Sequence, residues 1–191
     1  MFVGDYIFGY GSLIHPPGIN GRGMWRQYEE KDLIECRLSA HQRCWNAHHK
    51  GELYLGLTRV PAIRETPING VLFPIDKIDV EAFMSSEGSS SKSSDPVYEL
   101  VDVTKHIHNF PPGTERVLTC VTRKPSSEGA VSMRYQHHIR RALEHRGPEF
   151  AREFMETTDW NSFRYNTLYP NSGPYHLVIS DWESMLVKEK Q

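Results

Sequence analysis

The 191-residue sequence has no long hydrophobic run, no C-x-x-C pair and a formal net charge of only −2. No apolar stretch approaches the ~20 residues that a membrane-spanning helix requires, so we expect no membrane contact. Acidic residues number 24 and basic residues 22, which excludes the basic stripe of a non-specific nucleic-acid binder. The first residues also lack the basic and apolar segments of a secretory signal. We therefore expect a cytoplasmic protein without nucleic-acid partners.

The cysteines and histidines do not follow the spacing of a metal site. Cys36, Cys44 and Cys120 are odd in number, and we expect them to be buried, reduced thiols. The ten histidines lack the H-E-x-x-H spacing. Adjacent histidines on a helix diverge by about 100°, so they do not easily share one ion. We expect no metal and no cofactor.

Apolar and aromatic residues are plentiful enough for one sizeable core. Apolar residues make up 38% of the chain, with four Trp and nine Tyr. That composition and length are typical of a single globular domain, and we find no internal repeat and no linker. We predict one domain over residues 1–191.

The apolar pattern predicts strands in the first two thirds of the chain and helices after them. The expected strands cover residues 6–8, 36–45, 52–60, 70–75, 97–103 and 116–122. The period then changes to that of helices, over 132–145 and 148–158. The pattern therefore predicts an α+β fold with five to seven strands, in a sheet that can close into a barrel.

A short helix between these strands places a carboxylate on an apolar face. The helix is expected from Asp79, as its N-cap, to about Glu87, with Gly88 directly after it. One face carries Val80, Phe83, Met84 and Glu87. Burial and the negative end of the helix dipole both raise the pKa of such a glutamate, as a general base near neutral pH requires. The alternative is a helix-end glutamate that turns to water.

A glycine-rich loop follows the first strand, in the run Gly9-Tyr10-Gly11-Ser12-Leu13. Glycines on both sides of Tyr10 let the backbone approach a ligand, and successive N–H groups can bind an anion. The run does not match a dinucleotide-binding loop, a Walker A loop or a nucleophile elbow. A plain strand-ending turn is the alternative interpretation.

Other polar clusters are more typical of surfaces. Arg22, Arg26 and Arg43 can steer an anionic substrate or be ordinary surface charges. Seven serines crowd residues 85–94, which is typical of a surface loop. Neither cluster assigns a function by itself.

Four segments, in their order and spacing, resemble motifs of the gamma-glutamylcyclotransferase-like family. They are Phe8-Gly9-Tyr10-Gly11-Ser12-Leu13, Gly70-Val71-Leu72-Phe73, Glu87-Gly88 and Tyr98, with Arg43-Cys44-Trp45-Asn46 at the position of an intervening strand. The match covers roughly residues 6–122. The resemblance implies a small mixed β-barrel of about five to seven strands with flanking helices. It further implies a core over about 6–122 and a helical C-terminal extension over about 126–191.

The resemblance also implies an activity and a site. Family members bind the α-carboxylate of a γ-glutamyl group on the loop that corresponds to Tyr10, Gly11, Ser12 and Leu13. Glu87 corresponds to their general acid/base, and Tyr98 to a substrate-binding residue. The implied enzyme is a gamma-glutamyl cyclotransferase, which releases 5-oxoproline and a free amine or amino acid from a small-molecule γ-glutamyl substrate. Two departures from the family pattern are the serine-rich 85–94 segment and Leu100, where a basic residue is common.

The residue types suit that chemistry. The α-amino nitrogen attacks the γ-amide of the same molecule, so geometry supplies much of the rate, and one carboxyl can both take and return a proton. A glutamate of ordinary pKa facing an amine near pKa 8 would be uphill by roughly 5 kcal/mol, a gap that burial narrows. One alternative is a non-catalytic cavity protein that binds γ-glutamyl or carboxylate metabolites. Another is an interaction protein that uses the serine segment and the aromatic C-terminal tail.

Overall fold

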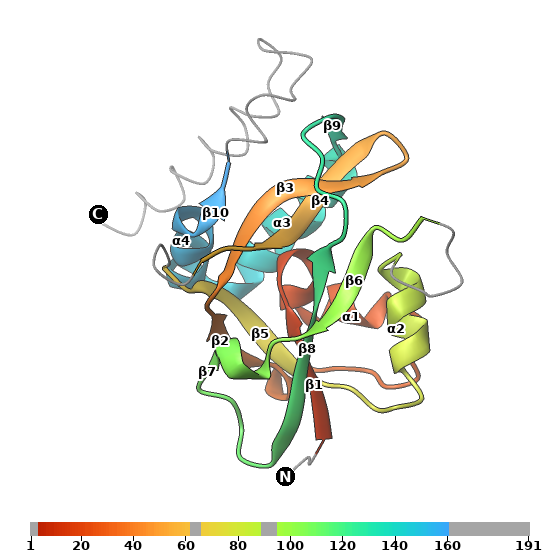
Figure 1. Ribbon diagram of the computed structural model, residues 1–191. Helices are drawn as coiled ribbons and strands as arrows, with labels where there is room; N and C mark the ends of the chain where they lie inside the picture. Colours follow the sequence, from red (N-terminus) through yellow and green to blue (C-terminus); the bar gives the residue numbers. More distant parts are fainter. Residues whose placement is uncertain (1–3, 62–65, 89–94, 161–191) are drawn as a thin grey trace.

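Two mixed β-sheets with flanking helices form the molecule (Figure 1). The structure, a computed structural model, describes residues 4–61, 66–88 and 95–160. The first sheet has the order β6-β8-β1-β5-β2-β7 and the second the order β10-β3-β4-β9. The first comprises β1 (Gly4–Gly9), β2 (Ile34–Leu38), β5 (Ile68–Pro74), β6 (Tyr98–Asp102), β7 (Ile107–His108) and β8 (Thr114–Thr122). The second comprises β3 (His41–His49), β4 (Glu52–Arg59), β9 (Ala130–Val131) and β10 (Thr158–Asp159).

The helices are short in the first half of the chain and longer in the second. The α-helices are α1 (Pro16–Asn20), α2 (Val80–Ser86), α3 (Met133–Arg146) and α4 (Pro148–Glu156), and the 3-10 helices are η1 (Gly11–Ile14), η2 (Glu30–Asp32) and η4 (Thr104–His106). Gly147, at a φ of 87°, separates α3 from α4 where the sequence predicts a break. Within the described ranges, no helix is long and apolar enough to cross a membrane.

β1 lies in the middle of the first sheet and carries the glycine-rich loop at its end. It pairs antiparallel with β5 and parallel with β8. Ile7 and Phe8 have no exposed surface, because their neighbours on both faces of the sheet are covered. The loop therefore begins from the buried end of this central strand. Together the curled sheets and their helices confirm the predicted α+β fold class.

The expectation of one strand over 36–45 is wrong. The chain turns at Ala40, which has a φ of 59°, so that β2 belongs to the first sheet and β3 to the second. β2 pairs with β5, whereas β3 pairs with β4. Because an alternating pattern continues through the turn and Ala40 is no turn former, the local sequence does not mark the corner.

Asp79 does not cap its own helix, contrary to the expectation from the sequence. Its buried carboxylate accepts hydrogen bonds from the backbone N–H groups of Trp25, at 2.7 Å, and Arg26, at 3.3 Å. Gly88, at a φ of 66°, does follow the helix as predicted. Asp79 thus attaches the segment after α1 to the start of α2.

Arg43 is a core residue rather than a surface charge or a steering group. It has no exposed surface, and its guanidinium carbon lies 3.7 Å from the ring centre of Phe154. Its Nη1 donates to the Phe154 carbonyl and the Thr158 hydroxyl, both at 3.2 Å, and its Nη2 donates to both oxygens of Asn69. Arg43 therefore joins β3 to β5, α4 and β10.

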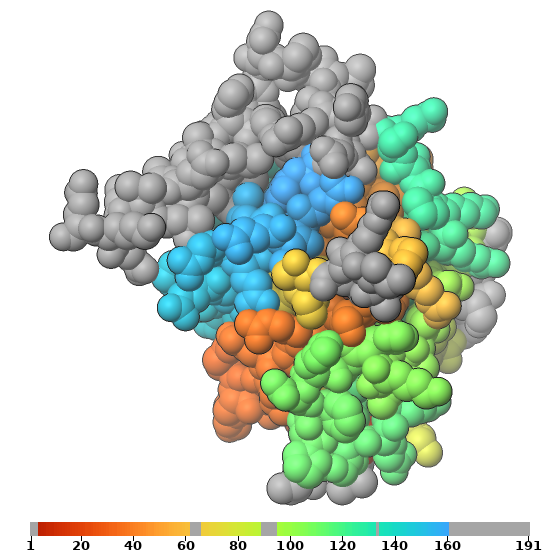
Figure 2. All heavy atoms as spheres, turned by 60° about the vertical axis from the view of Figure 1, so that its left-hand side comes forward, coloured from red at the N-terminus to blue at the C-terminus, as the bar shows by residue number. Residues whose placement is uncertain are grey.

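The C-terminal helices pack directly against the first half of the chain. Figure 2 shows α4, in blue, beside segments coloured orange and yellow. α4 contacts β5, and α3 contacts α4 and η1. Residues 161–191, which complete the predicted extension, and residues 89–94 of the serine-rich segment lie outside the described residues. All three cysteines are buried, as predicted, and none of them forms a disulfide.

Candidate functional site

The glycine-rich loop forms the tight turn η1 at the buried end of β1. All four of its residues from Gly11 to Ile14 are buried. Gly11 has a φ of 66°, a conformation that side chains disfavour. A β-carbon there would also lie 2.5 Å from the hydroxyl oxygen of Tyr135 on α3. The second glycine of the motif is thus required both by the backbone and by a neighbouring helix.

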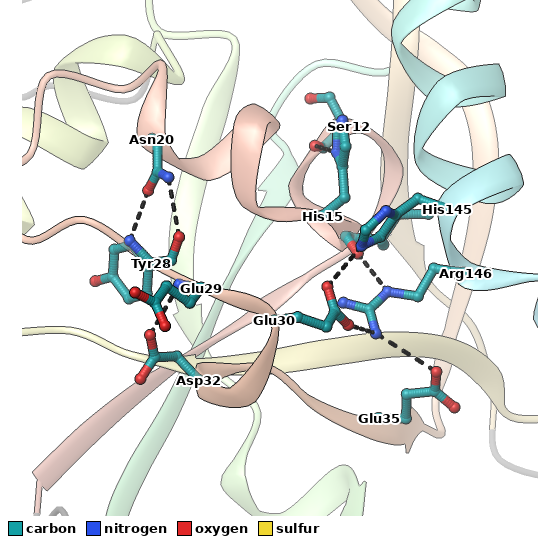
Figure 3. A network of polar contacts seen from close by, with 11 residues as sticks. Ser12, His15, Asn20, Tyr28, Glu29, Glu30, Asp32, Glu35, His145 and Arg146 are labelled. Carbon is teal, nitrogen blue, oxygen red and sulfur yellow. Dashed lines mark hydrogen bonds and ion pairs between the residues drawn. The ribbon is translucent and has the colours of Figure 1, made fainter.

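Contacts from three other segments keep this loop in place. A β-carbon on Gly18 of α1 would collide with the Ser12 carbonyl oxygen, so α1 lies directly against the loop. Figure 3 shows the network beyond it, in which His15 Nδ1 lies 3.2 Å from that same oxygen. Arg146 Nε donates to the Ile14 carbonyl at 2.6 Å, and its Nη1 pairs with Glu30 at 2.5 Å. The loop is therefore held rigidly between α1, η2 and the end of α3.

Arg22 connects Glu87 to the loop. Its Nη2 donates to the Ser12 hydroxyl at 2.9 Å, and its Nη1 lies 2.8 Å from Glu87 Oε1. The side chains are mostly buried, with 11% of Glu87 and 22% of Arg22 exposed. The Arg22–Glu87 contact is an ion pair without a well-aligned hydrogen bond, because Glu87 Oε1 has no partner of that geometry. The structure thus brings Glu87 and Ser12, two predicted site residues, to one guanidinium.

Burial makes Glu87 a stronger base than an exposed glutamate. Loss of solvent raises the pKa of Glu87, and the positive charge of Arg22 partly opposes that shift. Burial is the larger of the two effects, so the net shift is upward, which is the direction predicted from the sequence. Glu87 follows the last residue of α2, where Gly88 ends the helix.

Three tyrosines, of which Tyr10 is buried and Tyr98 and Tyr135 are partly buried, interact electrostatically with the carboxylate. Tyr10 donates its hydroxyl to the Cys120 carbonyl at 2.6 Å, and Tyr98 donates to the Leu55 carbonyl at 2.8 Å. The Tyr135 hydroxyl oxygen is hydrogen-bonded by the backbone N–H and the hydroxyl of Ser12. Burial, with a smaller contribution from the Glu87 charge, raises the pKa of all three phenols, that of Tyr135 to about 12. All three hydroxyls are therefore neutral at pH 7.

Leu13 contributes to packing rather than to this polar cluster. Its side chain is buried in the main apolar core. A β-carbon on Gly9 would lie 2.7 Å from the Leu13 carbonyl oxygen, so the loop folds back closely on the end of β1. Of the six predicted site residues, Glu87, Ser12, Tyr10 and Tyr98 meet in one cluster, Gly11 contacts it through Tyr135, and the Leu13 side chain packs away in the core.

Sequence reasoning missed Tyr135 and gave Arg22 no specific role. Tyr135 belongs to the predicted helix 132–145, but its partners are on a loop at the other end of the sequence, so no local signal marks it. Arg22 had one usable signal, since it stands between Gly21 and Gly23. Gly23 has a φ of 72°, which indicates a specially shaped backbone at that arginine.

A shallow depression of about 70 Å³ lies elsewhere, between β2 and α4. Its lining includes Glu35, Arg37, Asn69, His108, Phe150 and Glu153, none of which belongs to the Glu87 cluster. Arg37 and Glu153 already pair with each other there. The buried base, the guanidinium and the glycine-rich loop make the Glu87 cluster the better candidate site.

Comparisons with known proteins find likeness in structure alone. No family model and no curated protein sequence matches the chain. The solved structure of YkqA from Bacillus subtilis superposes with a TM-score of 0.54 at 18% identity, over 81% of this chain; the chain spans 55% of YkqA. A structure described as a gamma-glutamyl cyclotransferase superposes with a TM-score of 0.57 at 12% identity, over 94% of this chain and 98% of its own. The protein therefore has the gamma-glutamylcyclotransferase-like fold that the sequence motifs predict.

Proposed function

We propose that this protein is a gamma-glutamyl cyclotransferase, which releases 5-oxoproline and a free amine or amino acid from a γ-glutamyl compound. The observation that carries the proposal is the joining of Glu87 to Ser12 by Arg22, at 2.8 and 2.9 Å. A buried base of raised pKa thereby lies beside a loop suited to hold a carboxylate. The likeness in fold to a structure described as a gamma-glutamyl cyclotransferase supports the same activity.

In the proposed reaction, Glu87 carries protons from the attacking nitrogen to the departing nitrogen. The substrate places its α-carboxylate at the loop Tyr10–Leu13 and its α-ammonium toward Glu87. Glu87 takes a proton from the ammonium, and the freed nitrogen attacks the γ-carbonyl carbon, forming the C–N bond of the five-membered ring. Glu87 then returns the proton to the departing nitrogen as the original amide C–N bond breaks, and it passes the remaining extra proton of the ring nitrogen to the released amine, which leaves as an ammonium ion. The products are 5-oxoproline and the amine.

The intramolecular nucleophile and the raised pKa of Glu87 both favour this internal attack. The nucleophile is part of the substrate, so holding the γ-glutamyl chain bent supplies much of the rate acceleration. Because the pKa of Glu87 is raised, proton transfer from the ammonium to Glu87 costs less free energy than transfer to an exposed glutamate would.

The test measures 5-oxoproline from purified protein and a panel of γ-glutamyl dipeptides, glutathione and γ-glutamylamines. Product from at least one member is expected, with a loss of about 10³-fold or more in Glu87→Gln. Glu81→Gln is the matched control, because Glu81 is an exposed residue of the same helix α2, and it is expected to retain activity. Absence of product from the whole panel, or full activity in Glu87→Gln, would overturn the proposal.

The Arg22–Glu87 ion pair also fits a second function, a cavity protein that binds γ-glutamyl or carboxylate metabolites without turnover. The guanidinium lowers the pKa of Glu87 and so weakens it as a base, which suits binding more than proton transfer. Calorimetry distinguishes the two functions: heat of binding without 5-oxoproline formation would establish the binding protein.

A further inference from the structure

We propose that Arg22 binds the α-carboxylate of the substrate through its Nε–Nη2 edge, and so selects γ-glutamyl compounds in which that carboxylate is free. This inference rests on the proposed cyclotransferase function and assigns a specificity-determining residue to it. It goes beyond the backbone loop, which contributes N–H groups but no charge.

One edge of the Arg22 guanidinium keeps a hydrogen-bond donor that no neighbouring group accepts from. Nη1 faces Glu87 and Nη2 donates to Ser12, whereas Nε is buried and has no hydrogen-bond partner. Nε and Nη2 point in the same direction, which suits the two oxygens of a carboxylate. The same protein shows this geometry twice on its surface, where Arg37 binds Glu153 and Arg116 binds Asp5 through Nε and Nη2. A carboxylate on Arg22 would satisfy the orphaned Nε and share Nη2 with Ser12.

The backbone around Arg22 presents this edge at the loop. Arg22 follows α1, which lies directly against Ser12 through Gly18. Space around Gly23 is open, and 22% of the Arg22 side chain is exposed, although the Nε atom itself is buried. Asp79 anchors the same segment through Trp25, at 2.7 Å. The guanidinium therefore belongs to the rigid unit that forms the loop.

A carboxylate at Arg22 would also change the basicity of Glu87. Arg22 is the cationic neighbour that lowers the pKa of Glu87 against the effect of burial. The other titratable groups facing Glu87 are Tyr10 between β1 and η1, Tyr98 from β6 and Tyr135 from α3, which are neutral phenols. A bound anion offsets the guanidinium charge, so the proton affinity of Glu87 rises when substrate is present. Recognition of the substrate and activation of Glu87 as a base are thus coupled through Arg22.

The experiment compares a γ-glutamyl dipeptide with its α-carboxamide analogue, using wild type, Arg22→Gln and Arg22→Lys. Wild type is expected to prefer the carboxylate strongly in kcat/KM. Arg22→Gln is expected to lose about 10- to 100-fold of that preference, mainly in KM, because one charged double hydrogen bond is removed. Arg26→Gln is the matched control: Arg26 is 27% exposed on the same segment and pairs with Asp32 instead. It is expected to keep the wild-type preference.

The pH profile gives a readout that a purely structural role would not move. Without the cation, the pKa of Glu87 rises in the free enzyme, so the acidic limb of kcat/KM is expected at higher pH in Arg22→Gln than in wild type. If Arg22→Gln fails to fold by circular dichroism, Arg22→Lys decides, since lysine keeps the charge but lacks the paired Nε–Nη2 donors. It is expected to lose about tenfold in preference.

The outcomes separate the two proposals. A wild type that makes no 5-oxoproline from any γ-glutamyl compound overturns the cyclotransferase function and, with it, this inference. An active wild type whose carboxylate preference is unchanged in the folded Arg22 variants overturns the role of Arg22 alone.

Discussion

The hydroxyl oxygen of Tyr135 lies 2.5 Å from the position that a β-carbon would take on Gly11. A residue of the C-terminal helix α3 therefore closes over the glycine-rich loop that ends β1. The same hydroxyl is hydrogen-bonded to Ser12. The C-terminal helix α3 thus helps to form the site, and substitutions of Gly11 or Tyr135 test this contribution.

Gly11→Ala is expected to lower the free energy of unfolding by about 2–4 kcal/mol, because it adds both a strained φ of 66° and a collision with Tyr135. Urea unfolding measures the loss. Gly23→Ala is the matched control, with a φ of 72° but no atom within 4 Å of the new β-carbon. It is expected to cost only about 1 kcal/mol. Equal losses in the two variants would show that the Tyr135 contact is unimportant.

Tyr135→Phe removes the hydroxyl but keeps the ring, which packs edge-on against Trp45. Loss of the Ser12 hydrogen bonds is expected to cost about 1–2 kcal/mol of stability. If the protein is a cyclotransferase, the looser loop is also expected to raise KM. Tyr54→Phe is the control, since the Tyr54 hydroxyl donates to the exposed Glu52 at 2.7 Å. A Tyr135→Phe protein as stable and as active as Tyr54→Phe would contradict this role.

The raised pKa of Glu87 predicts how stability depends on pH. The folded state holds the Glu87 proton more tightly than the unfolded chain, whose usual value is 4.5. Glu87 is therefore least destabilising below pH 4.5, and wild type should lose stability relative to Glu87→Gln as pH rises through the folded pKa. Urea unfolding of both proteins from pH 4 to pH 8 measures this difference. Glu99→Gln, at an exposed strand position, is the control for the substitution itself, and a difference of opposite slope between wild type and Glu87→Gln would mean that Arg22 outweighs burial.

Arg43→Lys is expected to destabilise the protein by about 2–4 kcal/mol, because lysine cannot match the planar donor set or the stacking on Phe154. Burial lowers the pKa of Arg43 to about 9, so the guanidinium remains charged at neutral pH. Thermal unfolding measures the effect. Arg59→Lys on β4 is the control; its exposed side chain should make the change nearly neutral, within about 0.5 kcal/mol. If Arg43→Lys leaves the thermal stability unchanged, the polar contacts of Arg43 contribute little to it.

Local pattern in the sequence predicted most of the longer strands and helices, but not α1, β7, β9, β10 or the 3-10 helices. The change of apolar period after residue 125 predicted α3 and α4, and Gly147 marked the boundary between them. The i, i+3, i+4, i+7 spacing on α2 placed Glu87 toward the protein interior, where its side chain is 11% exposed. These predictions succeed because helix period, turn chemistry and burial of one face depend on residues close together in the chain.

Contacts between residues far apart in the chain could not be predicted from local pattern. Arg43 reads as a surface charge until β5, α4 and β10 surround it. Asp79 reads as a helix cap, but its carboxylate binds the segment at Trp25.

The amino-acid sequence by itself determined the α+β class, the glycine-rich loop and the inward-facing Glu87, because each follows from spacing within a few residues. Only the tertiary structure decided that Arg22 pairs with Glu87 and that Tyr135 closes over Gly11. The physical reason is that an ion pair or a steric contact depends on where segments distant in the chain meet. That meeting is set by the packing of the whole core.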